Sequence, residues 1–284
     1  MFVEQWHEAI QPILESIPGA IPTRADLGKL YPWQALTLHS QSRRMQTMID
    51  AAKRHIDAAV ALPDEWRIAW SAGKDSTALV ALCAEHGWCP RAMAVKDDMD
   101  YPGEDAYVSS IADRLGCKVD IIRPTVSLLG YLQDRGVDLT EDLHSQRASL
   151  SKDHFYGVID GYQTHSGHTG ILLGLRAQES RGRKMNRRFH GVTYRKEDGT
   201  AVCSPLADWS TEDVHAYLIR RNIPILPVYL CIDTGMESLS IRKSWYVSGG
   251  YAASIGGHYL WLRRWWPDLW RMAASISGSV ERLS

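Results

Sequence analysis

The sequence predicts an α/β fold in which a mostly parallel, doubly wound sheet is covered by helices. Three observations support this fold class. Short apolar segments alternate with segments of helical periodicity, turn residues separate them, and a glycine-containing loop joins the first apolar segment to a helix. Such alternation is typical of right-handed crossovers between parallel strands. A chain of 284 residues can hold one main domain of this kind with helical extensions at both ends.

The individual elements follow from hydrophobic periodicity and from the residues that stop it. Apolar side chains recur at helical spacing from Ser42 to Leu62, and Pro63 ends the pattern. Ser210 and Asp213 resemble a capping box at the start of a helix. The predicted strands cover residues 67–70, 91–96, 118–123 and 170–175, the predicted helices cover 42–62, 76–86, 104–115 and 210–221, and Asp198-Gly199 predicts a hairpin between 191–194 and 200–203.

This order of elements divides the chain into three parts. We expect an N-terminal helical extension over residues 1–50, the main α/β domain over 51–230 and a tryptophan-rich helical extension over 231–284. In the last part, Trp261, Trp265, Trp266 and Trp270 fall at helical spacing with Leu262, Leu269 and Met272. Packing of this helix against the main domain is the simpler interpretation, and a surface for a protein partner is the alternative.

Composition and charge exclude several classes of protein. Hydrophobic residues make up 45% of the chain and charged residues 23%, which is ordinary for a globular protein. The net charge of −1 creates no general attraction for nucleic acid or membranes, so any anion site depends on local clusters such as Arg181 to Arg188. Neither a secretory signal in Met1 to Ile10 nor an apolar run of about 20 residues is present, so we expect a cytoplasmic protein without membrane contact.

The five cysteines are odd in number and form no Cys-x-x-Cys pair. This pattern argues against a disulfide framework and against a zinc or iron–sulfur site, so no iron–sulfur cluster is expected. We expect Cys83, Cys89 and Cys117 to be small buried side chains.

The loop from Ser71 to Ser76, with the sequence Ser-Ala-Gly-Lys-Asp-Ser, follows the first predicted strand. Doubly wound sheets bind ligands at the carboxyl ends of strands, where a helix N-terminus also attracts anions. Gly73 allows the backbone to approach a phosphate, and Lys74, which we expect to be exposed, supplies positive charge. The Ser71 and Ser76 hydroxyls can donate hydrogen bonds, so the loop predicts a polyphosphate site.

The loop does not have the Walker A pattern, because Ile68 stands where that pattern has its first glycine and Asp75 follows the lysine. It resembles the PP-loop of the adenine nucleotide α-hydrolase-like superfamily, Ser-Gly-Gly-Lys-Asp-Ser, and differs from it only at Ala72. The difference matters only if this position requires a positive φ angle.

Three further segments resemble phosphoadenylylsulfate reductases and the small subunit of bacterial ATP sulfurylase. Asp98 to Glu104 is similar to their segment after the second strand, and Gly174 to Arg181 is similar to Gly-x-Arg-x-x-Glu/Gln-Ser-x-Arg. Ser204 to Val214, followed by Ile223 to Tyr229, is similar to their Pro-Leu-x-x-Trp-x-x-x-Asp-Val segment and to the approach to the final loop. The resemblance covers about residues 52–229 and implies the PP-loop fold.

The resemblance also implies roles for individual residues, with ATP and Mg²⁺ as the bound species. The phosphate-binding set is Ser71, Ala72, Gly73, Lys74, Asp75 and Ser76, joined by Gly174 and Arg176 from the later motif, and the implied catalytic set is Lys74, Asp75, Arg176 and Arg181. Asp75 is expected to orient the loop or to contact magnesium. Asp98 is expected to bind ribose or adenine, with a solvated turn carboxylate as the alternative.

Outside these sets, the resemblance gives Arg183 a place beside Arg176 and Arg181 in a clamp for a second anion. We expect Lys184, Arg187 and Arg188 to form a solvated basic face and Trp209 to belong to the core.

The C-terminal part departs from the reductase pattern. Phosphoadenylylsulfate reductases carry a nucleophilic cysteine in a Glu-Cys-Gly-Leu-His segment, whereas this chain continues after Tyr229 as Leu-Cys-Ile-Asp-Thr-Gly and has no cysteine after Cys231. Cys231 is therefore the candidate thiol, and Arg242 or Lys243 would lower its pKa if the loop folds back. The alternative is a buried small residue.

The resemblance therefore implies an enzyme that cleaves ATP between the α and β phosphates as an ATP pyrophosphatase or adenylyltransferase. The acceptor stays open between sulfate and a sulfur-activation step in nucleic-acid modification, such as DNA phosphorothioation. One alternative is a divergent phosphoadenylylsulfate reductase that uses Cys231 or a partner's thiol. Another is a nucleotide-binding subunit whose tryptophan-rich tail binds a catalytic partner.

Overall fold

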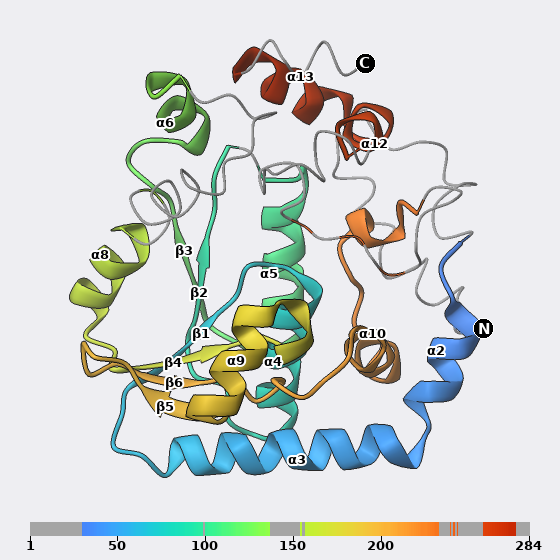
Figure 1. The fold of residues 1–284 in the computed structure, drawn as a ribbon, viewed down its shortest axis with the longest axis vertical. Coiled ribbons are helices and arrows are strands. Elements are labelled where there is room, and N and C mark those ends of the chain that lie inside the picture. Colours follow the sequence, from blue (N-terminus) through green and yellow to red (C-terminus); the bar gives the residue numbers. More distant parts are fainter. Residues whose placement is uncertain are drawn as a thin grey trace.

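The computed structural model describes residues 30–98, 100–136, 154, 157–232, 239, 241, 243 and 258–276 (Figure 1). Most of the expected N-terminal extension, residues 1–29, lies outside the described residues.

The six described strands form one sheet in the order β3-β2-β1-β4-β6-β5. Their bounds are β1 Trp66–Ala69, β2 Ala92–Val95, β3 Val119–Ile122, β4 Gly170–Leu173, β5 Thr193–Arg195 and β6 Ala201–Cys203. All neighbouring pairs are parallel except β5 and β6, which form the predicted antiparallel hairpin. The predicted mostly parallel sheet is therefore confirmed, and no strand boundary differs from its predicted position by more than two residues.

The helices predicted over 42–62, 76–86, 104–115 and 210–221 are all present, and the structure adds helices that were not predicted, including those over 128–134, 157–166 and 181–190. Their bounds are α2 Trp33–Ser40, α3 Arg43–Val60, α4 Lys74–Glu85, α5 Glu104–Leu115, α6 Leu128–Asp134, α8 Gly157–Ser166, α9 Arg181–His190, α10 Thr211–Arg220, α12 His258–Trp265 and α13 Pro267–Ile276, with short 3₁₀ helices η2 Ala177–Glu179 and η3 Pro227–Leu230. The Ser210 hydroxyl accepts from the Asp213 backbone amide at 3.0 Å, which confirms the capping box. Helix α4 begins two residues before the predicted Ser76 because Gly73 is already its N-cap.

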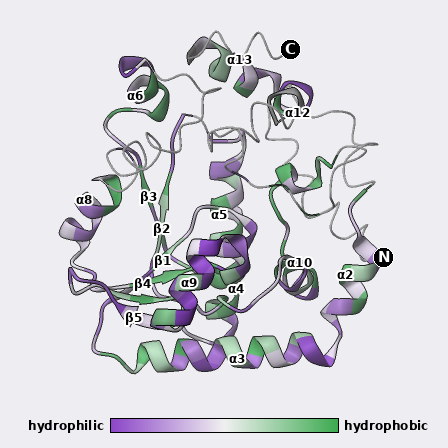
Figure 2. Cartoon of the chain, in the orientation of Figure 1, coloured by the Kyte–Doolittle hydropathy of each residue, from purple (hydrophilic) through white to green (hydrophobic). Residues whose placement is uncertain are grey.

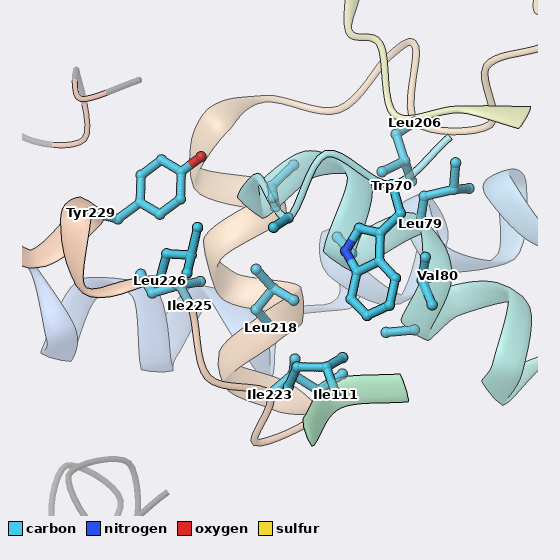
Figure 3. Close-up of a cluster of buried hydrophobic side chains, with 14 of the residues drawn as sticks. Trp70, Leu79, Val80, Ile111, Leu206, Leu218, Ile223, Ile225, Leu226 and Tyr229 are labelled. Carbon is cyan, nitrogen blue, oxygen red and sulfur yellow. The ribbon is translucent and has the colours of Figure 1, made fainter. Parts of the chain in front are cut away.

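Side chains pack on both faces of the sheet. On one face, Ile68 and Leu172 belong to a large core with residues of α3, α4, α5 and α10, part of which Figure 3 shows around Trp70. On the other face, Met93, Ile171 and Val202 form a smaller cluster that α8 covers. Because β1 and β4 are parallel neighbours in the middle of the sheet, the loops that follow them leave the sheet at the same edge.

The tryptophan-rich tail consists of two helices rather than one, because Pro267 lacks the backbone N–H that would continue α12 and instead begins α13. Trp261, Trp265 and Trp266 are all less than 5% exposed. The Trp261 indole N–H donates to the Cys231 carbonyl at 2.6 Å, and the Trp266 ring packs edge-on against Tyr101. The tail therefore packs against the main domain, and these three side chains are not available to a protein partner.

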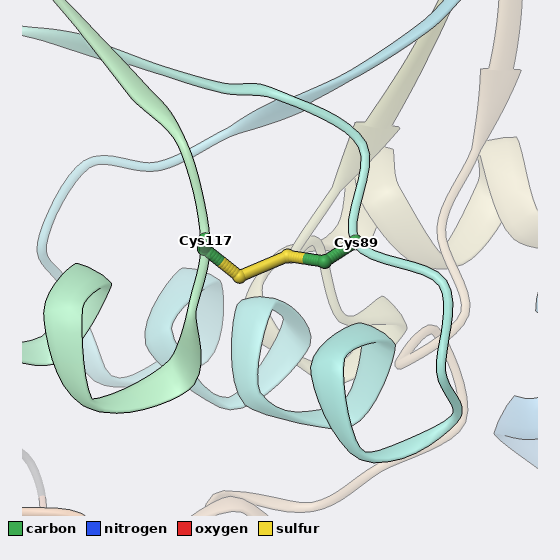
Figure 4. The surroundings of a disulfide bond; sticks show 2 residues. All are labelled: Cys89 and Cys117. Carbon is green, nitrogen blue, oxygen red and sulfur yellow. A yellow bond between two sulfur atoms is a disulfide. The ribbon is translucent and has the colours of Figure 1, made fainter.

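Cys89 and Cys117 form a disulfide bond, so the expectation that they are separate buried thiols is wrong (Figure 4). Their Cα atoms lie 6.1 Å apart because the segments leading into β2 and β3 run side by side. An odd total of cysteines leaves room for one such pair, and the spacing of 28 residues gave no signal of it. Disulfides persist best in oxidising compartments, so a cytoplasmic location stays a prediction. Within the described part of the chain, no helix is both long and apolar enough to span a bilayer.

Candidate functional site

The candidate site lies where the direction of the sheet connections changes. From β1 the chain proceeds outward to β2 and β3, and it then returns to β4 on the other side of β1. The segments that follow β1 and β4 meet at this point, which is where doubly wound sheets bind ligands. A Cβ atom on Gly174 would lie 2.8 Å from the Ser76 backbone nitrogen and 2.9 Å from the Asp75 carbonyl carbon. The fold therefore brings Gly174 directly against the predicted phosphate loop.

The loop is closed by its own hydroxyl groups. Ser76 Oγ donates to the Gly73 carbonyl at 3.1 Å and accepts from the Ser71 amide at 3.2 Å. The two serine hydroxyls lie 3.1 Å from each other. Gly73 leaves the space that this closure needs, since a Cβ there would lie 3.3 Å from Ser71 Oγ and from the Tyr229 hydroxyl.

Ala72 adopts a φ angle of 59°, so the position where the loop differs from the PP-loop pattern does require left-handed backbone. A non-glycine residue in this region costs about 1–2 kcal/mol. The side chain is fully buried, so the surrounding core holds the loop in this conformation.

Lys74 is 5% exposed, and the expectation of an exposed side chain is wrong. It is the first residue of α4, its Nζ donates to Asp75 Oδ2 at 2.7 Å, and it lies 5.4 Å from the centre of the Tyr229 ring. Burial lowers the pKa of Lys74, and the neighbouring Asp75 carboxylate opposes this effect.

Asp75 joins the loop to the motif after β4. Its Oδ1 accepts from Arg176 Nε at 2.5 Å, while its Oδ2 accepts from Lys74. Burial alone would raise the pKa of Asp75, but Lys74 and Arg176 outweigh it and the pKa is lowered. With both oxygens engaged by cations, Asp75 fits a positioning role and does not fit a magnesium ligand unless one ion pair opens. The described residues also contain no cluster of three or more His, Cys, Asp or Glu side chains suited to a metal.

The ion pairs continue from Arg176 toward α9. The Arg176 backbone amide donates to Glu179 Oε2 at 2.9 Å, and Glu179 also pairs with Arg183. Arg176 is 3% exposed and also donates to Thr211 Oγ1 at 3.2 Å. Arg181 begins α9 with an exposed side chain and forms no ion pair with a described residue. The structure therefore places Arg176 at the loop, whereas Arg181 lies outside this chain of ion pairs.

A cavity of about 230 Å³ lies beside Arg176, between α9 and the sheet. Its lining includes Gly182, Arg183, Asn186 and Tyr194. Two of its arginines are already neutralised, because Arg183 pairs with Glu179 and Arg187 pairs with Asp208.

Asp98 is exposed after the end of β2, and its carboxylate accepts from the Leu129 amide at 3.3 Å. Burial first, and then the neighbouring Asp97, raise the pKa of Asp98. No described contact joins Asp98 to the 71–76 loop, so its role toward ribose or adenine remains a proposal. Trp209 is 2% exposed, which confirms that it belongs to the core.

The Cys231 side chain is fully buried, which confirms the alternative of a small core residue. Its Sγ donates to the Pro227 carbonyl at 3.4 Å. Arg242 lies outside the described residues. Lys243 does not serve Cys231, because its Nζ donates to Glu104 Oε1 at 2.5 Å and to the Ser71 carbonyl at 2.8 Å.

The Lys243 contacts belong to a buried charge cluster that sequence reasoning missed. Glu104 pairs with both Lys96 and Lys243, and Asp100 accepts from Lys243 at 3.3 Å. Burial raises the pKa of Glu104, while the two lysines oppose the change. The acidic segment after the second strand was the only signal of this cluster in the sequence. Nothing local links Lys243 to it, because Lys243 is 172 residues from Ser71, whose carbonyl it contacts.

Sequence reasoning also assigned no role at the loop to Tyr229. Its hydroxyl accepts from the Lys74 backbone amide at 3.2 Å, at the N-terminus of α4. Gly73, the N-cap of this helix, supplies no capping side chain. The Tyr229 ring lies at the edge of the hydrophobic cluster in Figure 3, so the core holds the hydroxyl beside the loop.

A glycine-containing loop at the switch point of a mostly parallel sheet, with a lysine, an aspartate and an arginine joined by ion pairs beside it, defines an α/β protein of the PP-loop type. The model of the phosphoadenosine phosphosulfate reductase domain matches residues 65–239, and the chain belongs to this family. The chain is 25% identical over 212 residues to a phosphoadenosine 5′-phosphosulfate reductase of Alkalilimnicola ehrlichii, covering 69% of this chain and 82% of that protein.

Two solved structures are similar at lower levels. A phosphoadenylyl-sulfate reductase from Candida auris, in complex with phosphate, has a TM-score of 0.48 and 14% identity over 65% of this chain and 89% of its own. An NMN synthetase from Francisella tularensis has a TM-score of 0.43 and 12% identity over 84% of this chain and 93% of its own.

Proposed function

We propose that this protein binds ATP at the 71–76 loop and transfers its adenylyl group to an acceptor. An acceptor oxygen attacks the α-phosphorus, the bond from the α-phosphorus to the α–β bridging oxygen breaks, and pyrophosphate leaves with the bonding electrons. The acceptor is sulfate or another substrate of sulfur chemistry, including a nucleic-acid modification step.

The state of the cysteines carries this proposal. Cys89 and Cys117 are joined to each other, and Cys83, Cys203 and Cys231 are all fully buried. Thiol attack on a sulfonucleotide needs an accessible thiolate. Burial also raises the pKa of Cys203 to about 11, which disfavours its thiolate at neutral pH. Phosphate chemistry at the loop requires no thiol.

The loop residues support binding and positioning of the phosphates. The N-terminus of α4 favours an anion, and its N-cap Gly73 places no side chain of its own beside it. Lys74 and Arg176 supply two cations, and Asp75 forms an ion pair with each of them. A polyphosphate would compete with Asp75 for Lys74. Fixed cations near the leaving pyrophosphate stabilise developing negative charge without reorganisation. Magnesium would enter with ATP as part of the substrate.

The test is to incubate purified protein with ATP, Mg²⁺ and candidate acceptors, and to measure pyrophosphate and adenylated products by mass spectrometry. Lys74→Met preserves most of the buried volume and removes the charge, so nucleotide turnover should fall about 10- to 150-fold. Lys118→Met removes a charge from an exposed lysine far from the loop and should leave turnover unchanged. Pyrophosphate release that is equal in both variants would reject the loop as the site.

A second candidate is a divergent phosphoadenylylsulfate reductase, favoured by the family match and by the name of the relative with 25% identity. This function requires Cys231 to become accessible, or a partner to supply the thiol. Sulfite release from the sulfonucleotide in the presence of thioredoxin would support it. If Cys231→Ser loses sulfite release, and if neither this variant nor the unmodified protein cleaves ATP, the reductase function replaces the adenylyl-transfer proposal.

A further inference from the structure

Helix α9 has two faces of different character. The inner face carries Gly182, Arg183, Asn186 and Arg187, which line the cavity beside Arg176. Arg187 pairs with Asp208 through two hydrogen bonds of 3.0 and 2.8 Å, and Arg183 pairs with Glu179. The charges of the inner face are therefore balanced within the protein.

The outer face carries three further cations, Arg181, Lys184 and Arg188, whose side chains are all exposed. Their spacing places them on one stripe of the helix, about 10 Å long at the usual rise per residue. None of the three forms an ion pair with any residue in the described ranges. Figure 2 shows the helix coloured as hydrophilic along much of its length.

Two apolar side chains stand beside this stripe. Phe189 is 70% exposed and Met185 is 42% exposed. They are four residues apart, so they lie next to each other on the same side of the helix. Among the large apolar side chains that are exposed in the described residues, Phe189 is the aromatic one, and it stands beside three cations that have no acidic partner there.

We propose that the outer face of α9 binds single-stranded nucleic acid. Arg181, Lys184 and Arg188 contact successive phosphates, and Phe189 stacks on an unpaired base. An acidic protein segment would satisfy the cations, but it would leave the aromatic ring without a stacking partner. A groove or stripe of cations with an adjacent aromatic side chain is the usual combination in proteins that bind single strands. The net charge of −1 is no obstacle, because the charge is local.

The outer face of α9 lies close in sequence to the residues that contact the 71–76 loop. Ser180 caps α9, and the residue before it, Glu179, links Arg183 to Arg176 and so to Asp75 in the loop. The outer face therefore begins at Arg181, two residues after Glu179, which belongs to the ion pairs beside the candidate nucleotide site. Binding at this face does not depend on the adenylyl transfer proposed above.

The experiment measures binding of a fluorescently labelled single-stranded oligonucleotide of mixed sequence by anisotropy, at several salt concentrations and without ATP. In the variant Arg181→Gln, Lys184→Gln, Arg188→Gln, the slope of log K against log salt should become shallower by about 2, at about 0.7 per phosphate contact. Phe189→Ala should weaken binding about 5- to 150-fold without changing the slope, because stacking involves no counterion release.

The matched control is Arg43→Gln, Arg54→Gln, Arg114→Gln, which removes the same charge from exposed arginines on α3 and α5. The control should retain the slope of the unmodified protein. Thermal unfolding of each variant verifies that the fold is intact.

Equal losses in both triple variants would overturn the proposal, since they would reflect overall charge alone. Polyglutamate is a second competitor in the assay. If it competes as well as unlabelled oligonucleotide, and if Phe189→Ala has no effect, the ligand is an acidic protein and the proposal is overturned. A tighter complex with duplex than with single strand would reject the stacking of Phe189. If oligonucleotide binding requires the three cations but the protein does not cleave ATP, the nucleic-acid surface is supported and only the proposed adenylyl transfer is rejected.

Discussion

Gly174 and Ser76 are packed so closely that a Cβ atom on Gly174 would lie 2.8 Å from the Ser76 backbone nitrogen. The neighbouring atoms are backbone atoms of α4, which cannot move aside as a flexible side chain would. This contact fixes the distance between the segment that follows β4 and the 71–76 loop.

Gly174→Ala should therefore displace the loop and weaken ATP binding at least 10-fold, with a stability loss of about 1–3 kcal/mol, the usual cost of overpacking. Isothermal titration with ATP and chemical denaturation measure the two effects. Gly161→Ala is the matched control, because a Cβ atom at Gly161 meets nothing within 4 Å. ATP affinity that is unchanged in Gly174→Ala would show that the loop does not depend on this contact.

Ala72 should tolerate glycine but not a branched residue. Its φ angle of 59° is strained for alanine, so Ala72→Gly should relieve strain and change the free energy of unfolding by less than about 1 kcal/mol after loss of the buried methyl group. Ala72→Val should destabilise the protein by more than about 2 kcal/mol, because a β-branched side chain at positive φ adds strain and volume to a buried site. Urea denaturation measures the free energy of unfolding of both variants, and equal losses of stability in the two would contradict this prediction.

Asp75 should contribute stability that depends on pH. Although burial disfavours its carboxylate, Lys74 and Arg176 keep its folded pKa below the ordinary value of 3.8. A carboxylate with a depressed folded pKa contributes its full stability above the unfolded pKa, and the contribution is lost as the pH falls through the folded value. Asp75→Asn should lower the free energy of unfolding at pH 7 by about 3–5 kcal/mol, as expected for removing one partner of a buried ion pair.

The difference between the parent protein and Asp75→Asn should then shrink below about pH 4. Denaturation curves collected across this range measure it. Asp105→Asn provides the comparison, because the ion pair of Asp105 with Arg123 is more than half exposed on both sides and should contribute no more than about 1 kcal/mol. A constant difference at every pH would mean that the Asp75 carboxylate is not held ionised by its neighbours.

The Cys89–Cys117 disulfide should stabilise the region between α4 and β3. The bond closes a loop of 28 residues, for which restriction of the unfolded chain contributes about 3–4 kcal/mol. Replacing both cysteines by serine should lower the free energy of unfolding by up to this amount. Thiol titration of the denatured, unreduced protein should detect three free cysteines, and detection of five would contradict the bond.

Local sequence determined most of the fold and the position of the loop. Short apolar segments predicted β1 to β4, and the Asp198-Gly199 turn predicted the hairpin of β5 and β6, because periodicity and turn signals are properties of neighbouring residues. The capping pair Ser210 and Asp213 predicted the start of α10 for the same reason. The order Ser-Ala-Gly-Lys-Asp-Ser after a strand located the candidate phosphate loop without knowledge of the strand's neighbours.

The tertiary structure decided which side chains meet at that loop. Arg176 reaches Asp75 across 101 residues, Lys243 reaches the Ser71 carbonyl across 172, and Cys89 reaches Cys117 across 28. It also buried Lys74, which the sequence presented as exposed, and it decided between the two interpretations of Cys231 in favour of a buried side chain. Periodicity and capping act within a few residues, whereas these contacts depend on strand order and on the packing of helices that are distant in sequence. For that reason the sequence could locate the loop. Only the folded chain could show that Asp75 pairs with Lys74 and also with Arg176, which comes from the segment after β4.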